Sequence, residues 1–341
     1  MKILFICRTQ GWMGTYMHQV AGGFQLLGHH TTLMDYHLID KSRWLTNLIG
    51  YKKRYFMERK TSALTKLIKD IKPDMVIFAL AHLLFDFSRI RDSYHGILVF
   101  FDMDGPALPC YEKGFEWIKE LDLLASVSRL TVRQLNSLGY DNVMYWPHGV
   151  DPRYFRPLQL SGREIRDFGS SMAFVGRPTK RRANMLKEFP IGPLAIWGRR
   201  WWKRPYNRDP VITRALRSKS DILGLDLVKM YNASTLILNI LREPFAEHST
   251  IMNLQVFSVP ACGTCLLTEW VEEIEEAFDV DKEILVFKNP SEFVEKAIRY
   301  AHDQELARRI GQAGRLRCLG EHTHKHRAQQ LLRELGLPIS P

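Results

Sequence analysis

The sequence lacks the long apolar runs that would place it in a membrane. No stretch approaches the roughly 20 apolar residues that a membrane helix needs. The opening MKILFIC becomes polar at Arg8, Thr9 and Gln10, so it fits neither a secretory leader nor a membrane span. We therefore expect a cytoplasmic protein, with a peripheral position at a membrane left open.

Cysteine is scarce, and only Cys262 and Cys265 lie close together. The other cysteines are scattered, which argues against a disulfide framework and a four-ligand zinc site. A redox CxxC normally opens a helix after a strand, whereas this pair precedes a probable strand, CLLTE. We interpret the pair as part of a glycine turn at Gly263. Neither the cysteines nor the histidines predict a metal site.

Acidic residues are nearly absent between Arg177 and Lys219. Thirteen Lys and Arg residues there are opposed by only Glu188 and Asp209, so this segment alone carries the whole net charge of +11. Such a local excess indicates an anionic partner: the phosphates of a small nucleotide, a nucleic acid backbone such as DNA, or an anionic membrane. A solvated basic face without function is the alternative.

Short apolar runs alternate with helical patterns along the 341 residues. Strand, glycine-bearing loop, helix and strand at the start form a βαβ unit, which crosses over right-handed into a parallel sheet. The strands that we expect are 2–7, 31–35, 75–80, 97–101, 123–127, 143–145, 171–176, 194–197, 235–239, 265–268 and 284–287.

A stretch rich in proline and glycine, residues 146–169, separates two runs of this alternation and reads as a linker. We predict an α/β protein with two doubly wound, Rossmann-like domains facing a cleft. Residues 1–155 form the N-terminal domain and residues 156–341 the C-terminal domain. The final helix is a candidate to pack back on the N-terminal domain.

Residues 43–60, RWLTNLIGYKKRYFMERK, interleave aromatic and basic side chains. One interpretation is an amphipathic helix packed on the core. The other is a surface that binds anionic lipid or follows a phosphate backbone.

Gly176 directly follows an apolar strand, and Arg177, Lys180 and Arg181 follow it at the start of a helix. Glycine lets backbone amides approach an anion, the helix start adds positive dipole, and the cations neutralise phosphate charge. No Walker or Rossmann glycine pattern is present. A second turn is the expected counterpart for the same diphosphate, with these residues: Ala261, Cys262, Gly263 and Thr264.

Charged side chains that follow two of the expected strands are candidates for catalysis. FFDMDGP ends a strand of the N-terminal half and offers Asp102 and Asp104 as bases; their alternative role is to cap the following turn. Arg177 and Lys180 are the expected stabilisers of a departing diphosphate.

Several segments resemble the successive landmarks of the GT-B glycosyltransferases, most closely the CgeB-like, spore-maturation-type branch. They include YWPHGVDPRYFRP, AFVGRP, VKMYNASTLILN, NLQVFSVPACGTCLLTE and HTHKHRAQQLL. The resemblance implies a metal-independent hexosyl- or pentosyltransferase that uses a nucleotide diphosphate sugar and no other cofactor. It implies that the N-terminal domain, residues 1–155, binds the acceptor, with acceptor-side glycines at Gly11 and Gly14. It also implies that the C-terminal domain, residues 156–341, binds the nucleotide sugar. The remaining donor-binding residues that we expect are Trp197, Gly198, Glu247, His248, Asn253 and Ser258.

The resemblance includes one departure. Similar proteins usually read Arg-x-Phe-Glu-x-Pro-Ala-Cys-Gly before the last strand, and this sequence has Gln255 and Ser258 in place of the Arg and Glu. The expected acceptor is a lipid-linked or envelope glycan, or a modified base in DNA. The alternative is a catalytically degenerate GT-B paralogue that binds nucleic acid.

Overall fold

The computed structural model describes residues 1–39, 51–79, 84–103, 114–243 and 251–339. The chain forms two compact units. Unit 1 comprises residues 1–148 and 324–341, and unit 2 comprises residues 149–323.

Unit 1 contains a parallel sheet of six strands in the order β2-β1-β3-β4-β5-β6. Each strand is short, and nearly all residues of the central strands are buried, as expected of a sheet covered on both faces. The strands are β1 (Lys2–Cys7), β2 (His30–Asp35), β3 (Met75–Ala79), β4 (Ile97–Asp102), β5 (Leu123–Ser126) and β6 (Val143–Tyr145).

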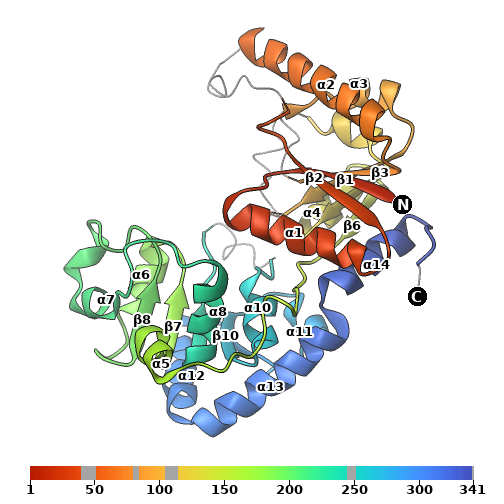
Figure 1. Ribbon diagram of the computed structural model, residues 1–341. Helices are drawn as coiled ribbons and strands as arrows, with labels where there is room; N and C mark the ends of the chain where they lie inside the picture. Colours follow the sequence, from red (N-terminus) through yellow and green to blue (C-terminus); the bar gives the residue numbers. More distant parts are fainter. Residues whose placement is uncertain (40–50, 80–83, 104–113, 244–250, 340–341) are drawn as a thin grey trace. The chain divides into compact units, whose positions relative to one another are not determined.

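Helices cover both faces of this sheet (Figure 1). One face packs on α2 (Tyr51–Ile71), α3 (Phe87–Ser93), η3 (Glu116–Glu120) and α4 (Arg129–Ser137), through a core that includes Phe78. On the other face α1 (Gly11–Gln25) lies beside the last helix of the chain, α14 (His324–Glu334).

Unit 2 contains a parallel sheet of five strands in the order β11-β10-β9-β7-β8. The strands are β7 (Ser170–Val175), β8 (Leu194–Trp197), β9 (Ser234–Asn239), β10 (Cys265–Glu269) and β11 (Leu285–Phe287). The prediction of two parallel α/β sheets is confirmed.

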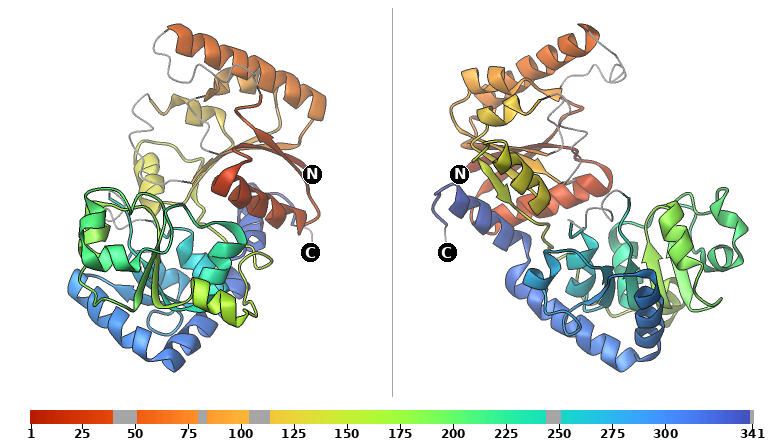
Figure 2. Two further views of the ribbon diagram at one scale, coloured as in Figure 1. Left: turned by 60° about the vertical axis from the view of Figure 1, so that its left-hand side comes forward. Right: turned by 180° about the vertical axis from the view of Figure 1, so that it is seen from behind.

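The main core of unit 2 lies between this sheet and α6 (Lys180–Leu186), α7 (Pro210–Ala215), α12 (Pro290–His302) and the start of α13 (Gln304–Glu321). Figure 2 shows α12 and α13 in blue beside the strands. The remaining elements of unit 2 are α5 (Gly162–Phe168), η4 (Tyr206–Arg208), α8 (Gly224–Ala233), α10 (Gln255–Ala261) and α11 (Ile274–Ala277).

Three local expectations differ from the structure. Gly11 and Gly14 lie inside α1 rather than in the loop before it. The expected linker contains helix α5, which begins with a capping box between Ser161 and Glu164. Helix α10 extends to Ala261, so Pro260 and Ala261 are helical and only the residues after them turn.

The basic and aromatic stretch 43–60 is described only in part. Residues 43–50 lie outside the described residues, and α2 begins at Tyr51. Tyr55 is exposed, with the Arg59 guanidinium 5.9 Å from its ring centre, whereas Lys60 is buried and donates to the Tyr36 carbonyl. Among the described helices, none combines the length and apolar character of a membrane span.

Candidate functional site at the carboxyl edge of the second sheet

The carboxyl ends of the unit 2 strands form one edge of the sheet, where open α/β sheets bind their ligands. β7 ends before Gly176, β8 before Gly198, β9 at Asn239 and β10 at Glu269. We call this the carboxyl edge. The opposite, amino edge carries the residues that precede each strand.

The ends of β7 and β8 approach each other closely at two glycines. A Cβ atom added to Gly198 would lie 2.3 Å from the Gly176 carbonyl oxygen, so only glycine fits there. The buried Trp201 donates from its Nε1 to the same carbonyl at 2.7 Å. The Gly176 turn is therefore held in place from two sides.

Arg177 and Lys180 follow this turn with exposed side chains. Within the described part of the chain, neither is paired with a carboxylate. Thr179 lies between them and caps α6, accepting from the Arg182 backbone N–H at 3.2 Å. Two cations are thus available for an anion at the carboxyl edge.

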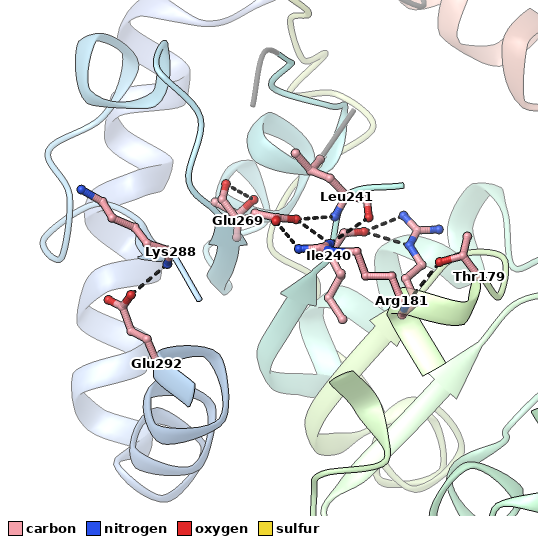
Figure 3. Close-up of polar contacts among 9 residues, drawn as sticks. Thr179, Arg181, Ile240, Leu241, Glu269, Lys288 and Glu292 are labelled. Atoms are coloured by element: carbon pink, nitrogen blue, oxygen red, sulfur yellow. Dashed lines mark hydrogen bonds and ion pairs between the residues drawn. The ribbon is translucent and has the colours of Figure 1, made fainter. Parts of the chain in front are cut away.

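Arg181 has a different role, because it binds the ends of neighbouring strands (Figure 3). Its guanidinium makes a two-point ion pair with Glu269 and a 3.4 Å contact with the Leu241 carbonyl. The Glu269 carboxylate also accepts from the Leu241 backbone N–H at 3.2 Å. These contacts join α6 to β10 and to the segment after β9, and the expected contact between Arg181 and the donor stays a prediction.

Arg182 is buried and supports the same turn from behind. Its guanidinium donates to the Ile240 carbonyl at 2.6 and 2.9 Å and to the Arg177 carbonyl at 3.0 Å. Burial, with a smaller contribution from the nearby Arg242, lowers the pKa of Arg182 to about 10, which leaves it charged at neutral pH. Arg182 therefore fixes the Arg177 backbone and leaves the Arg177 side chain free.

A chain of amide groups continues along the carboxyl edge. Asn239 and Asn253 exchange side-chain hydrogen bonds at 2.9 and 3.1 Å, and the Asn253 oxygen accepts from the Gln255 backbone N–H at 3.0 Å. Gln255 then donates from Nε2 to the Val175 carbonyl at 3.1 Å. The start of α10 is thereby tied to the end of β7, beside Gly176.

The expected diphosphate cradle between the turns at Gly176 and Gly263 is wrong. Gly176 follows β7, whereas Gly263 precedes β10, and the two strands run parallel in one sheet. The residues Ala261, Cys262, Gly263 and Thr264 therefore belong to the amino edge, on the other side of the sheet from Arg177. A pocket of about 550 Å³ lies there, and its lining includes Gly263, Thr264 and Arg308.

Side chains near that turn have structural roles. Ser258 is buried and hydrogen-bonds the Tyr231 hydroxyl, and its expected role in donor binding stays a prediction. Thr264 donates to the Tyr231 carbonyl at 2.8 Å. Cys262 and Cys265 are free thiols, and burial raises the pKa of both, that of Cys262 to about 12. Such thiols are inert packing groups.

Trp197 is also a packing residue. Its indole is buried and stacks on the Phe168 ring of α5, with ring centres 5.8 Å apart. It holds α5 against the edge strand β8. The expected donor-binding role of Trp197 therefore stays a prediction without support from its surroundings.

In unit 1, Asp102 ends β4 and is buried, and it accepts from the Ser126 hydroxyl at 2.7 Å. Gly14 packs so tightly on the Thr9 backbone that an added Cβ would lie 2.2 Å from it. Gly11 has open space around its Cβ position but a φ of 69°. The expected residues Asp104, Glu247 and His248 lie outside the described residues.

Glu269, Asn239 and Gln255 were not predicted from the sequence. A signal for two of them exists, because Asn239 and Glu269 are the polar residues that end the apolar strands STLILN and CLLTE. Parallel strands place such residues at the ligand-binding edge. The described residues contain no cluster of three or more His, Cys, Asp or Glu side chains suited to a metal ion.

Comparisons with known proteins agree with this architecture. Residues 178–333 match the model of a family described as glycosyl transferase-like. The curated proteins contain no match. Sucrose-phosphate synthase from Thermosynechococcus elongatus has a similar structure, with a TM-score of 0.71, 13% identity, and 98% of this chain and 99% of that chain covered.

Two further solved structures are similar over nearly the whole chain. A glycosyltransferase from Rickettsia africae ESF-5 has a TM-score of 0.68 and 14% identity, covering 98% of this chain and 97% of its own. The Anabaena protein HepE, in complex with UDP and glucose, has a TM-score of 0.67 and 11% identity, and the match covers 98% of this chain and 99% of HepE. The chain thus has the fold of the GT-B glycosyltransferases, and its residues 178–333 are similar to the family described as glycosyl transferase-like.

Proposed function

We propose that this protein is a glycosyltransferase that moves a sugar from a nucleotide diphosphate sugar to an acceptor hydroxyl. The observation that carries the proposal is the pair of exposed cations, Arg177 and Lys180, beside the rigid Gly176 turn. A departing diphosphate gains negative charge as the glycosidic bond breaks, and pre-positioned cations stabilise that charge. The CgeB-like branch remains a proposal supported by the sequence landmarks.

The surroundings of the two cations favour this role. Contacts from Trp201 and Arg182 fix the backbone on both sides of Arg177, so the site needs little reorganisation during the reaction. Because the Anabaena protein of similar fold is described in complex with UDP and glucose, UDP is the first donor nucleotide to test. Asn253, at the same edge, is proposed to contact the nucleoside.

The proton acceptor is proposed to come from the FFDMDGP segment of unit 1. Asp102 is buried and bonded by Ser126, so we assign it a positioning role. Asp104 is kept as the proposed base on the sequence alone. Because Arg177 and Lys180 supply the positive charge in this proposal, we expect a sugar transfer that survives treatment with EDTA.

A thermal-shift titration with UDP, GDP, ADP and TDP tests the donor site, because a ligand that binds only the native state raises its melting temperature. Lys180→Ala is the test variant and Lys187→Ala is its matched control, since these exposed lysines lie at opposite ends of α6. A charge-assisted hydrogen bond contributes about 1.5–3 kcal/mol, so Lys180→Ala should weaken nucleotide binding roughly 10- to 100-fold. The control should bind as the natural protein does.

Two results would contradict the proposal. One is equal loss of binding in both lysine variants, which would place the diphosphate elsewhere. The other is the absence of a thermal shift with every nucleotide, which would favour the alternative of a degenerate paralogue that no longer uses a donor.

A further inference from the structure

Most cations of the basic segment 177–219 remain exposed after folding. Of its 13 Lys and Arg residues, Arg181 and Arg199 are paired with carboxylates and Arg182 is buried. The others are exposed, and within the described residues none is paired with a carboxylate. These are Arg177, Lys180, Lys187, Arg200, Lys203, Arg204, Arg208, Arg214, Arg217 and Lys219.

Half of them belong to two segments that meet beside the end of β8. The Arg217 backbone N–H donates to the Ile196 carbonyl at 2.9 Å, so the chain after Leu216 runs along the outer edge of β8. Asp221 then pairs with Arg199 at 3.1 Å. Residues 199–204 and 217–221 are therefore neighbours. We call these residues, together with the adjoining residues 222–225, the β8 corner. Its exposed cations are Arg200, Lys203, Arg204, Arg217 and Lys219.

The β8 corner also exposes large apolar side chains. Trp202 is 43% exposed, Leu223 48% and Leu225 60%. The Lys203 ammonium lies 5.2 Å from the Trp202 ring centre. The neighbouring Trp201 is fully buried and anchors the segment to Gly176, so the exposed residues project from a fixed base.

We propose that the β8 corner binds the surface of an anionic lipid bilayer. Basic residues are attracted to anionic headgroups, and tryptophan and leucine insert into the boundary between headgroups and acyl chains. A nucleic acid backbone fits this surface less well. Single-stranded nucleic acid is held by cations together with several stacking aromatics, and exposed leucines contribute nothing to that contact.

The proposed bilayer contact also indicates which class of molecule carries the sugar-accepting hydroxyl. A surface beside Gly176 and Arg177 that rests on lipid favours an acceptor hydroxyl carried by a membrane lipid or lipid-linked glycan. This consequence rests on the proposed glycosyl transfer, whereas the bilayer contact itself does not.

The test is co-sedimentation of the full chain with vesicles of phosphatidylcholine alone and of phosphatidylcholine mixed with phosphatidylserine. We expect binding to the mixed vesicles only, and release by added salt. Each basic residue at an anionic surface contributes roughly a fivefold factor to partitioning, so Lys203→Gln with Arg204→Gln should weaken binding roughly 30-fold. Trp202→Ser should weaken it while keeping the charge.

The matched control is Arg308→Gln with Arg309→Gln, which removes the same charge from exposed positions at the start of α13. This control should bind vesicles as the natural protein does. Equal loss in both double variants would mean that only net charge matters, and the β8 corner would be the wrong surface. Binding to single-stranded DNA but not to mixed vesicles would also overturn the proposal and favour a nucleic acid partner.

The nucleotide titration separates this proposal from the donor proposal. Lys203→Gln with Arg204→Gln should keep the thermal shift produced by UDP, while Lys180→Ala should reduce that shift and keep vesicle binding. Loss of vesicle binding alone therefore concerns the β8 corner, and loss of nucleotide binding alone concerns the donor site.

Discussion

Two glycines determine how closely the ends of β7 and β8 approach each other. Gly198 has a φ of 139° and faces the Gly176 carbonyl without a side chain between them. Arg177 directly follows Gly176. The position of this candidate donor-binding cation therefore depends on the absence of a Cβ atom at Gly198, at the end of the neighbouring strand β8. A single added methyl group at Gly198 would collide with the Gly176 carbonyl oxygen.

Gly198→Ala should therefore destabilise unit 2. The new Cβ would lie 2.3 Å from a backbone oxygen, and relieving this overlap, together with the strained φ, costs about 2–4 kcal/mol. Gly192→Ala is the matched control, since Gly192 also has a positive φ, 128°, but no atom within 4 Å of its Cβ position. Chemical denaturation measures both, and equal destabilisation would show that the overlap is relieved without cost.

A second residue-scale prediction concerns two buried histidines of unit 1. His148 Nδ1 lies 2.7 Å from the Tyr16 hydroxyl, and the His324 ring packs edge-on against the Tyr16 ring. Burial, reinforced by the charge of Arg327, lowers the pKa of both histidines to about 3. Between about pH 3 and pH 6.5 they are neutral in the folded chain, whereas the unfolded chain protonates them.

Unit 1 should therefore lose stability as the pH falls below about 6.5, by up to about 1.4 kcal/mol per pH unit for each histidine. The measurement is thermal unfolding at about pH 7.5 and about pH 5. His148→Gln should flatten this dependence, and His302→Gln, at an exposed position of α12, should leave it unchanged. A profile as steep in His148→Gln as in the natural protein would contradict the assignment.

At the scale of elements, α1 and α14 approach each other through a glycine. A Cβ atom on Gly23 would lie 2.3 Å from the His324 carbonyl oxygen, at the start of α14. Polar contacts fix the same helix: Trp146 Nε1 donates to the Arg327 carbonyl at 2.7 Å, and Arg327 donates to the carbonyls of Pro147 and His148. The helix pair is thus close and precisely placed.

Gly23→Ala should push these two helices apart and destabilise unit 1 by about 1–3 kcal/mol. Gly320→Ala is the control, because Gly320 is also helical but has open space at its Cβ position. Alanine there should be neutral or stabilise the chain by up to about 1 kcal/mol. If both variants have the same melting temperature, the contact between α1 and α14 is more tolerant than its geometry indicates.

The strands were predictable because most are short, largely apolar runs, and all eleven expected runs are strands of the two sheets. The helices were less predictable. α10 has no clear helical period and contains Pro260, yet it is helical because it is buried against the sheet and α13. Tertiary packing outweighs local preference there.

The candidate site was partly predictable for the same reason. Arg177 and Lys180 follow a strand, so the sequence alone indicates the carboxyl edge for them. Gly263 precedes a strand, so the same rule places it at the amino edge. For this reason the expected diphosphate site between Gly263 and Gly176 was wrong. The ion pair between Arg181 and Glu269 joins residues 88 positions apart, and no local pattern predicts it.

At the scale of the whole molecule, unit 2 is formed by one continuous segment and unit 1 by two separate segments. Unit 2 is continuous from residue 149 to 323 and has its own core, whereas unit 1 needs residues 324–341 as well. Ala328, Leu331 and Leu332 of α14 are fully buried in unit 1.

Deleting residues 324–341 should therefore unfold unit 1 selectively. Uncovering two buried leucines costs on the order of 3–6 kcal/mol, a large part of the stability of a small domain. Limited proteolysis with mass spectrometry should show rapid cleavage within residues 1–148 and a resistant fragment near residues 149–323. Equal resistance of both fragments would contradict the dependence of unit 1 on α14.

Leu331→Ala is a milder change, and it should lower the stability of unit 1 by about 2–5 kcal/mol.

The return of the last helix to the first unit also has a consequence during protein synthesis. A nascent chain that has left the ribosome up to residue 148 still lacks the helix that covers α1. Translation of the intervening segment takes roughly 9–35 s at about 5–20 residues per second. Unit 2 is thus the first unit that can be completed, and the apolar surface beside α1 stays open to chaperones until residues 324–341 have been made.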